Sequence, residues 1–483
     1  MDFTRYTKQF IGGEWREGSS DVMMRNYNPY NGELLHEYRA ASKKDMDDAF
    51  AAAKAAQPAW AATLPRVKSE KMEALMAALQ RRKADLFDIL RAEGGVVVPK
   101  CHGEFNGAMG HMRQAVSFPY RMDGKIMRSD TPQERINYII RKPKGVIAVI
   151  APWNAPFILA VRSVIPAVAT GNTVVLRPSS NTPMTAFFLA ELFEEAGFPK
   201  GVLNVISGPS SETGDAFVTH PTANLVSFTG STEVGRRIGM LCGERLTDVS
   251  LELGGNNPSC VLPDADLENA AKGVVWGSLF HAGQVCMCTN RVIVHKDIYD
   301  RFVPMVVDVV KKLKVGDPQN PETFIGPLAS AHQVKSVNAK IQAAIAAGAK
   351  VAWEGRTEGG VVHPWVLCDA TNDMPGVCEE MFGPVVTLIK AESEEEMIRM
   401  ANDTEYGLSS AVFGGDEYHC MRFARQMQSG MVFINDQTIN EESHIIFGGE
   451  KQSGVGRFNG QWVLEKFTTE QRIGVQEELK PYF

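Results

Sequence analysis

The chain begins with a helical pattern of apolar positions and then changes to strand-like alternation. Residues 43–62 and 66–92 are rich in alanine, and their apolar positions recur at intervals of three and four, which predicts helices that cover a sheet. Residues 121–141 alternate instead and carry turn residues at Asp123-Gly124 and Asp130-Thr131-Pro132. This alternation predicts a strand pair that projects from the main body, and an open strand edge of this kind often pairs with another subunit.

Between residues 143 and 260, short apolar runs alternate with helical segments. The first two runs, 145–150 and 172–176, predict buried strands. They are followed by a predicted helix at 182–196 and predicted strands at 203–206 and 225–228. This alternation predicts an α/β fold with a doubly wound parallel sheet, and such sheets bind their ligands at the carboxyl ends of the strands.

Four of these predicted strands end in polar or glycine-rich residues. The four stretches are 151–156, 177–180, 207–210 and 229–235. The last opens a helix with Thr229-Gly230-Ser231, and a helix N-terminus with glycine and hydroxyl residues binds phosphate through its free N–H groups. A single turn of this kind is usually only a helix cap, whereas four at consecutive strand ends indicate a nucleotide site. The usual G-x-G-x-x-G fingerprint is absent.

A second alternating region follows residue 290. Its predicted helices are 297–314, 331–348 and 417–429, and its predicted strands are 385–390 and 410–414. This pattern predicts a second α/β domain. Residues 467–475 suggest a final strand that joins the 121–141 arm. The segment 94–100 fits none of these patterns.

Cys286 is the first candidate for chemistry. It lies between an apolar helical segment, 266–280, and a strand-like run at 291–294, beside Gly283 and Gln284. A reactive thiolate needs partial exposure and polar neighbours, so this position favours a nucleophile. The alternative is a small buried apolar side chain, which is the commoner role of a free cysteine.

Glu252 is the second candidate. It lies between Leu251 and Leu253 and is followed by two glycines. A carboxylate in an apolar setting has a raised pKa, because desolvation disfavours its charged form, and it can then act as a general base near neutral pH. The alternative is a strand residue that faces solvent.

The composition describes an ordinary globular protein of two or three domains. The 483 residues are 44% hydrophobic and 22% charged, with a net charge of −7, so no basic face for nucleic acid is expected. The sequence has no stretch of 18 apolar residues, so we expect no membrane-spanning helix. The eight cysteines are scattered and no His/Cys grouping has zinc-ligand spacing, so we expect no metal and a reducing, cytoplasmic location.

Six motifs, in this order and spacing, resemble those of the aldehyde dehydrogenase superfamily over nearly the whole chain. They are Pro152-Trp153-Asn154, Phe228-Thr229-Gly230-Ser231, Glu252-Leu253-Gly254-Gly255, Gly283-Gln284-Val285-Cys286, Glu379-Glu380-Met381-Phe382-Gly383-Pro384 and Phe447-Gly448-Gly449. The resemblance implies three parts. These are an NAD(P)-binding domain (1–120 and 142–251), a catalytic domain (252–445) and an oligomerisation arm (121–141 and 465–483).

The resemblance also implies a mechanism. Cys286 attacks the aldehyde carbon, and the Asn154 amide and the backbone N–H of Cys286 hold the resulting oxyanion. After hydride transfer to NAD or NADP, Glu252 activates the water that hydrolyses the thioester to a carboxylic acid. A covalent intermediate of this kind divides one difficult step into two easier ones.

The implied cofactor site contains residues from several of the motifs. Its members are Trp153, Arg177, Ser180, Gly230, Ser231, Glu380 and Phe382. Many family members have lysine where Arg177 stands and glutamate where Ser180 stands. Since the site loses a negative charge and keeps a positive one, we expect it to tolerate the 2′-phosphate of NADP as well as to accept NAD.

Within the superfamily, the chain resembles the benzaldehyde, vanillin and salicylaldehyde dehydrogenases most. The stretches that carry this likeness are 156–163 and 447–458. The implied substrate residues are Arg162, Phe157, Met287, Cys288 and Phe447. Arg162 lies two helical turns after Asn154, so both can face one tunnel, where the arginine can bind a ring hydroxyl or a carboxylate. It can equally be paired with a neighbouring acid or face a subunit interface.

We therefore expect an NAD(P)-dependent enzyme that oxidises aromatic aldehydes in the catabolism of aromatic compounds, assembled as a homodimer or homotetramer. The main alternative is a semialdehyde dehydrogenase in which Arg162 binds a distal carboxylate. A CoA-acylating enzyme is disfavoured by Glu252, and a non-catalytic member by the presence of all the site residues. A cysteine hydrolase without a cofactor would leave the phosphate-binding turn unexplained.

Overall fold

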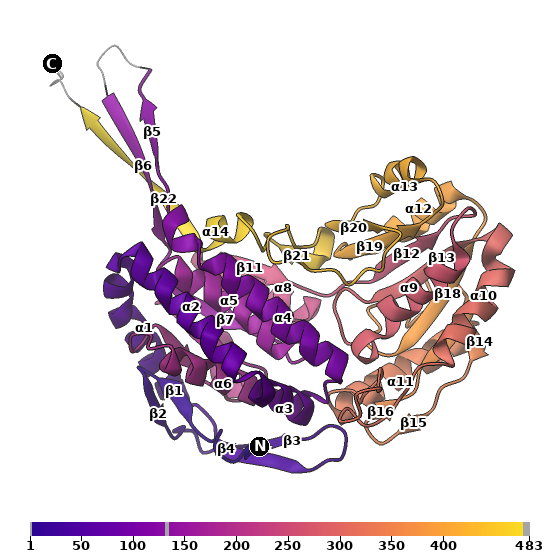
Figure 1. Cartoon of the computed structure of the whole chain (residues 1–483), viewed down its shortest axis with the longest axis horizontal. Coiled ribbons are helices and arrows are strands. Elements are labelled where there is room, and N and C mark those ends of the chain that lie inside the picture. Colours follow the sequence, from indigo (N-terminus) through magenta and orange to yellow (C-terminus); the bar gives the residue numbers. More distant parts are fainter. Residues whose placement is uncertain (1, 131–134, 477–483) are drawn as a thin grey trace.

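Two lobes and a projecting arm make up the structure, a computed structural model that describes residues 2–130 and 135–476. A large open sheet forms the centre of each lobe, and a three-stranded sheet leaves the first lobe as the arm (Figure 1). Helices cover both large sheets, so the predicted α/β fold is confirmed.

The first sheet has eight strands in the order β2-β1-β9-β8-β7-β10-β11-β21. They are β1 (Gln9–Ile11), β2 (Glu14–Arg16), β7 (Val146–Ile150), β8 (Thr173–Arg177), β9 (Leu203–Val205), β10 (Leu225–Thr229), β11 (Asp248–Glu252) and β21 (Gly454–Val455). From β9 to β11 the pairing is parallel. Phe157 and Leu176 belong to one apolar core, and Phe50 and Val226 belong to a second. The predicted doubly wound sheet is therefore confirmed, with its apolar strands buried on both faces.

The helices of the first lobe pack on these two faces. They are α1 (Lys43–Ala62), α2 (Pro65–Arg81), α3 (Lys83–Gly94), α4 (Val98–Ala115), α5 (Pro156–Ala169), α6 (Pro183–Glu195), α7 (Ser210–Val218) and α8 (Thr232–Arg245). A hairpin of β3 (Met23–Tyr27) and β4 (Leu34–Arg39) lies beside them. The capping box that Ser42 and Asp45 form fixes the start of α1 at the predicted residue.

Two stretches of this lobe differ from the prediction. Residues 66–92 form nearly all of α2 and most of α3 rather than one helix, because the backbone leaves helical geometry at Arg82 (φ −99°, ψ 20°). The unassigned segment 94–100 is the turn into α4. Gly95 ends α3 with φ +59°, where a Cβ would collide with Pro327, and Val96 and Val97 are buried.

The second sheet has seven strands in the order β14-β17-β18-β13-β12-β19-β20. They are β12 (Asn257–Val261), β13 (Thr289–His295), β14 (Lys350–Trp353), β17 (Trp365–Ala370), β18 (Val385–Ala391), β19 (Ser409–Phe413) and β20 (Met431–Ile434). Its helices are α9 (Leu267–Leu279), α10 (Lys296–Val310), α11 (Ala331–Ala346), α12 (Glu394–Asn402) and α13 (Glu417–Ala424). The small pair β15 (Thr357–Glu358) and β16 (Val361–Val362) lies apart from this sheet. This confirms the second α/β unit.

The arm consists of β5 (Lys125–Arg128), β6 (Arg135–Pro143) and β22 (Thr468–Gln476), which follows α14 (Trp462–Phe467). β22 pairs with β6 along its whole length, from Thr468–Pro143 to Gln476–Arg135. The predicted union of the final strand with the 121–141 pair is therefore confirmed. The predicted turn at 130–132 and the end of the predicted arm fall partly on 131–134 and 477–483, outside the described residues.

Candidate active site

The carboxyl edge of the first sheet brings three strand ends together, two of them predicted. β7, β10 and β11 are neighbours, and Asn154, Ser231 and Glu252 lie at or just beyond their ends. Asn154 is buried, and its amide nitrogen donates to the carbonyl of Gln284 at 2.9 Å. This bond joins the first lobe to the loop that carries Cys286 in the second.

The loop before Cys286 has an unusual backbone. His281 and Ala282 both have φ of 54°, and Gly283 follows with φ +74°. Non-glycine residues in this region are strained and persist only where the surroundings hold them. A Cβ on Gly283 would collide with the carbonyl oxygen of Gly383, so the loop rests directly on the turn that follows Glu380.

A Gly283→Ala variant should therefore lose both stability and activity. The added methyl meets a backbone atom and an unfavourable φ, for which we expect a destabilisation of about 2–4 kcal/mol. Gly32→Ala is the matched control, because Gly32 has φ +76° but nothing within 4 Å of a Cβ. Gly32→Ala reports the backbone strain alone, and Gly283→Ala reports the strain together with the collision. Chemical denaturation measures the free energy of unfolding of both variants, and equal losses of stability would contradict this description of the loop.

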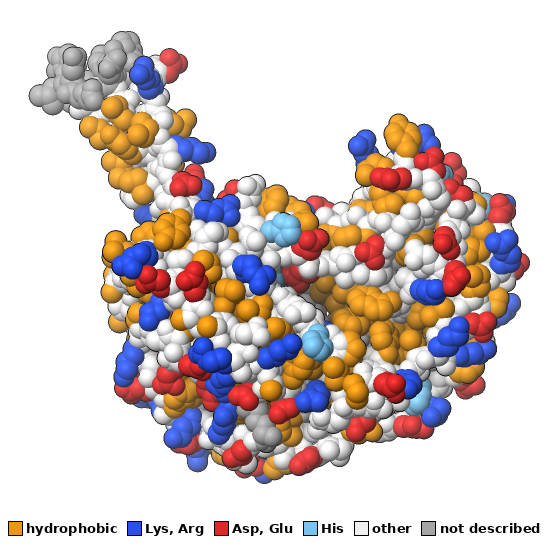
Figure 2. Space-filling view, in the orientation of Figure 1, with side chains coloured by type: hydrophobic (Ala, Val, Ile, Leu, Met, Phe, Trp, Pro, Cys, Tyr) orange, Lys and Arg blue, Asp and Glu red, His pale blue; other side chains and the backbone are white. Residues whose placement is uncertain are grey.

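Two cavities meet at Asn154 and Cys286, and both residues line each of them. One cavity, of about 270 Å³, lies over the carboxyl edge of the first sheet and also contains Glu252 and Glu380. The other, of about 560 Å³, opens between α4, α5 and the second lobe. Figure 2 shows hydrophobic side chains gathered in a hollow between the two lobes. A thiol at the junction can react with one molecule while a second lies beside it.

Cys286 is partly buried at this junction. Burial raises the pKa of its thiol to about 12, and the charge of Arg162 is the strongest influence in the opposite direction. Among the described residues, no group accepts a hydrogen bond from the backbone N–H of Cys286. That N–H and the Asn154 amide are thus two donors beside the sulfur, as an oxyanion hole requires.

Glu252 is buried, and within the described part of the chain neither of its carboxyl oxygens has a hydrogen-bond partner. Burial raises its pKa to about 8. An unpaired buried carboxyl group is costly to the fold and is typical of a functional site. Because Glu252 and Cys286 line the same cavity, the carboxylate is placed to act on a group attached to the sulfur.

The smaller cavity also contains five of the seven predicted cofactor residues. They are Trp153, Gly230, Ser231, Glu380 and Phe382. Ser231 is the N-cap of α8, and one oxygen of Glu380 accepts from the backbone N–H of Gly255 at 3.2 Å. A Cβ on Gly254 would collide with the other oxygen of Glu380, so the carboxylate packs directly against the backbone here. A helix N-terminus, a carboxylate and aromatic walls fit a nicotinamide dinucleotide.

Arg177 and Ser180 lie outside this cavity. Arg177 ends β8, the next strand along the edge, and its guanidinium donates to the carbonyl of Gly208 and to the Ser210 hydroxyl. Ser180 is exposed in the loop that follows. No carboxylate of the described residues pairs with Arg177, so its positive charge is not neutralised by an ion pair.

The larger cavity contains three of the five predicted substrate residues, namely Arg162, Met287 and Phe447. Phe157 does not line it, because its ring points to the opposite side of α5 and packs on Phe188 with ring centroids 5.9 Å apart. Cys288 does not line it either. Its sulfur is buried and turned toward the carbonyl of Phe280, so the assignment of these two residues to the pocket wall is corrected.

Several residues of this cavity were missed at the sequence level. They are Lys100, Glu104, Gly103, Gly107, Gly110 and His111 on α4, Trp276 and Phe280 near the end of α9, and Glu441. The spacing of the three α4 glycines, which places them on one helix face, was the one available signal. Glu441 lies 279 residues from Arg162 in the chain and has no motif around it.

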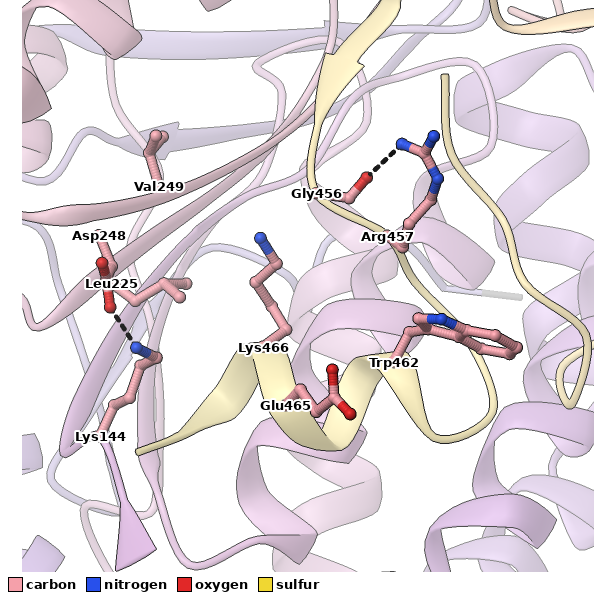
Figure 3. A pocket seen from close by; sticks show the side chains of 9 residues that line it. All are labelled: Lys144, Leu225, Asp248, Val249, Gly456, Arg457, Trp462, Glu465 and Lys466. Atoms are coloured by element: carbon pink, nitrogen blue, oxygen red, sulfur yellow. Dashed lines mark hydrogen bonds and ion pairs between the residues drawn. The ribbon is translucent and has the colours of Figure 1, made fainter. Parts of the chain in front are cut away.

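A third cavity, of about 410 Å³, lies behind β11 and is not a reaction site, since neither Cys286 nor Asn154 lines it. Figure 3 shows the ion pair of Lys144 with Asp248 on one side and Lys466 of α14 reaching toward Gly456. A Cβ on Gly456 would touch the Lys466 amino group. The positive charge of Lys466 lowers the pKa of Glu252, the last residue of β11.

The described residues contain no group of three or more His, Cys, Asp or Glu side chains arranged to hold a metal ion. Over the same residues, no helix combines the length and apolar character needed to cross a membrane.

Comparison with known proteins agrees with this site. The aldehyde dehydrogenase family model matches residues 15–473. The chain is 44% identical to a vanillin dehydrogenase of Corynebacterium glutamicum, over 97% of this chain and 98% of that protein. It is 41% identical to a benzaldehyde dehydrogenase of Bacillus subtilis, over 100% of this chain and 99% of the other.

Solved structures give the same relationship. An NAD-dependent benzaldehyde dehydrogenase from Corynebacterium glutamicum superposes with a TM-score of 0.90 at 42% identity, covering 97% of this chain and 98% of the other. A betaine aldehyde dehydrogenase from Staphylococcus aureus in complex with NAD+ superposes with a TM-score of 0.95 at 33% identity, covering 99% and 97%.

Proposed function

The chain belongs to the aldehyde dehydrogenase family, and on this basis we propose that it oxidises aromatic aldehydes to carboxylic acids with NAD or NADP. The vanillin and benzaldehyde dehydrogenases to which it is similar support this substrate class. The observation that carries the proposal is the lining of the larger cavity, which includes Cys286 together with glycines of α4 and several aromatic rings.

Three of the lining residues are glycines on one face of α4, namely Gly103, Gly107 and Gly110. Nothing lies within 4 Å of a Cβ placed on Gly103, and a Cβ on Gly107 would meet only the flexible end of Ile158. Trp276 and Phe280 belong to the same cavity lining, and they stack with ring centroids 4.4 Å apart. A cavity whose lining combines glycines with aromatic rings suits a planar ring, which gains from stacking on aromatic groups.

The proposed chemistry assigns one role to each residue at the junction. The sulfur of Cys286 attacks the carbonyl carbon, and the Asn154 amide and the Cys286 backbone N–H stabilise the negative charge that develops on the oxygen. A bound nicotinamide supplies the acceptor for the hydride of the aldehyde carbon. Glu252 then takes a proton from water, and this water hydrolyses the thioester on Cys286.

We propose that the dinucleotide is held by the cavity over the carboxyl edge. The N-terminus of α8 at Ser231 suits the pyrophosphate, Glu380 suits a ribose hydroxyl, and Trp153 and Phe382 pack edge-to-face beside it at 5.4 Å. Arg177 is free of a carboxylate partner and therefore accommodates a 2′-phosphate, so both NAD and NADP are accepted.

The pH dependence of turnover should respond to Lys466. Four charged groups act on Glu252, namely Arg162, Arg457 and Lys466, which lower its pKa, and Glu441, which raises it. A Lys466→Met variant removes one positive charge, so the pKa of Glu252 rises further and the rise of kcat with pH moves to more alkaline pH. Lys144→Met, in the same groove but paired with Asp248, should leave the profile in place. A profile that does not move in Lys466→Met would exclude this electrostatic role.

The proposal is tested by following reduced nicotinamide with purified protein and either cofactor. Benzaldehyde, vanillin and salicylaldehyde should be oxidised faster than succinic semialdehyde. Preference for succinic semialdehyde would favour the semialdehyde alternative with Arg162 as the carboxylate site. Stimulation by CoA would favour acyl transfer, hydrolysis of esters in a protein that fails to bind nucleotide would favour a hydrolase, and no turnover at all would favour a non-catalytic protein.

The arm and the cysteines support two further parts of the proposal. Apolar side chains are exposed on all three arm strands, among them Ile126, Tyr138 and Ile473, as expected of a surface that a second copy covers in a homodimer or homotetramer. A monomer in sedimentation analysis would contradict this.

All eight cysteines are free, which suits a reducing cytoplasm, where the enzyme would act in the catabolism of aromatic compounds. We keep the division into NAD(P)-binding domain, catalytic domain and arm at the predicted boundaries.

A further inference from the structure

Arg162 is held by contacts with two aromatic rings and by an ion pair that neutralises its charge. It is 1% exposed, and its guanidinium lies between the rings of Phe447 and Phe458, 4.5 and 5.0 Å from their centroids. Its Nη1 is 3.4 Å from Oε1 of Glu441, and Nε2 of His111 is 3.2 Å from the same oxygen. The arginine is therefore fixed in place by stacking and neutralised by a carboxylate of the same cavity.

The other cation of the cavity wall is neutralised in the same way. The amino group of Lys100 donates to Glu104 at 2.9 Å. The second oxygen of Glu104 accepts from the backbone N–H groups of Phe157 and Ile158 at the N-terminus of α5. Apart from the histidine, the lining thus contains two cations and two anions, each cation paired with one anion.

We propose that Glu441 makes this cavity selective for uncharged aldehydes, by occupying the one arginine that would otherwise bind a carboxylate on the substrate. The inference rests on the proposed function and adds to it the charge of the accepted substrate and the residue that sets it. The substrates it assigns are ring aldehydes without a carboxylate substituent, and it excludes both formylbenzoates and semialdehydes that carry a carboxylate.

The physical reason is the cost of a third charge in a buried site. A substrate carboxylate near Arg162 would meet Glu441 as well, and like charges at short range in a desolvated pocket repel strongly. Although burial opposes its ionisation, Arg162 and His111 hold the pKa of Glu441 at about 2, so its negative charge persists at every pH at which the enzyme would work. The pair therefore discriminates by repulsion as well as by lack of a free cation.

The test compares neutral and anionic aldehydes of the same shape. The wild-type protein should oxidise methyl 4-formylbenzoate with a kcat/KM at least about 100-fold above that of 4-formylbenzoate, because the anion loses hydration without gaining a partner. In Glu441→Gln the ratio should fall by about tenfold or more, since Arg162 becomes free to bind the carboxylate. Glu442→Gln, the next residue along and largely exposed, is the matched control and should keep the wild-type ratio.

A double variant guards against a merely structural effect. Glu441→Gln leaves Arg162 buried without its partner and can lower stability, so thermal unfolding is measured alongside. Arg162→Met/Glu441→Leu removes both charges and should keep the preference for the neutral ester, because the gain for the anion requires Arg162. Equal use of ester and acid by the wild-type protein, or the same gain in the double variant, would overturn the proposal.

A pair of aliphatic aldehydes distinguishes failure of this proposal from failure of the proposed function. If ring aldehydes prove poor substrates, butanal and succinic semialdehyde still report charge selectivity at the same cavity. Preference for butanal that weakens in Glu441→Gln would support the role of Glu441 while the aromatic assignment fails. Preference of the wild-type protein for succinic semialdehyde would overturn both.

Discussion

Replacement of Cys286 by alanine should lower the rate of aldehyde oxidation by a factor on the order of 10⁴ to 10⁶, as the loss of a nucleophile does in other covalent mechanisms. The sulfur is the group at the junction of the two cavities that can form the covalent bond, and the oxyanion donors have nothing to stabilise without it. The effect is measured as the rate at which reduced nicotinamide forms with benzaldehyde as the substrate. Binding of the dinucleotide should be unchanged.

Cys288→Ala is the control for this experiment. Cys288 is two residues away and also a free thiol, but it is buried and turned toward the carbonyl of Phe280. Its removal should leave turnover within a few-fold of wild type, since it lines neither cavity. Substantial activity in Cys286→Ala, or an equal loss in Cys288→Ala, would show that the nucleophile has been assigned to the wrong side chain.

Replacement of Glu252 by glutamine should slow steady turnover about 10²- to 10⁴-fold, the usual contribution of a general base. The amide fills the same space but cannot accept the proton of water, so the reaction should stop at the thioester. Rapid mixing with benzaldehyde and NAD should then give a single burst of reduced nicotinamide, close to one per active site, followed by very slow turnover.

Glu268→Gln, on the exposed start of α9, serves as the control and should behave as wild type. A Glu252→Gln variant with no burst would mean that the carboxylate is needed before the thioester forms. A variant with normal steady turnover would exclude Glu252 as the base.

The parts of the fold that the sequence predicted correctly are those with strong local patterns. β7 and β8 are apolar runs buried on both faces, and α1 has a capping box at its first turn. β12 was not predicted, because Asn257 and Pro258 at its start resemble a loop. It forms nonetheless, since β13 and β19 flank it on both sides and pair with it. Tertiary pairing overrides local preference there.

Helix α4 is the most consequential omission. Pro99 and three glycines make its sequence a poor helix former, and its helical state is stabilised by packing against α2, α3 and α5. The same glycines line the larger cavity. The features that conceal this helix from a pattern analysis are therefore those that the proposed function uses.

The candidate site was predictable where it follows from the sheet and from motifs, and not where it depends on distant contacts. Asn154 follows from the rule that ligands bind at the carboxyl ends of parallel strands, and Glu252 from its apolar setting between two leucines. The partner of Arg162 did not follow, because Glu441 belongs to a loop without a pattern, and only the fold brings it to α5. Phe157 was misplaced because the helical face on which a residue lies depends on which neighbour the helix packs against.

In the proposed mechanism, an aromatic aldehyde is converted to a thioester on Cys286, and water activated by Glu252 hydrolyses this thioester. Intact-protein and peptide mass spectrometry of Glu252→Gln, quenched after mixing with benzaldehyde and NAD, tests it most directly. Each chain should gain the mass of one benzoyl group, located on Cys286 and absent when NAD is omitted. An unmodified Cys286 in a variant that has produced reduced nicotinamide, or an acyl group on another residue, would contradict it.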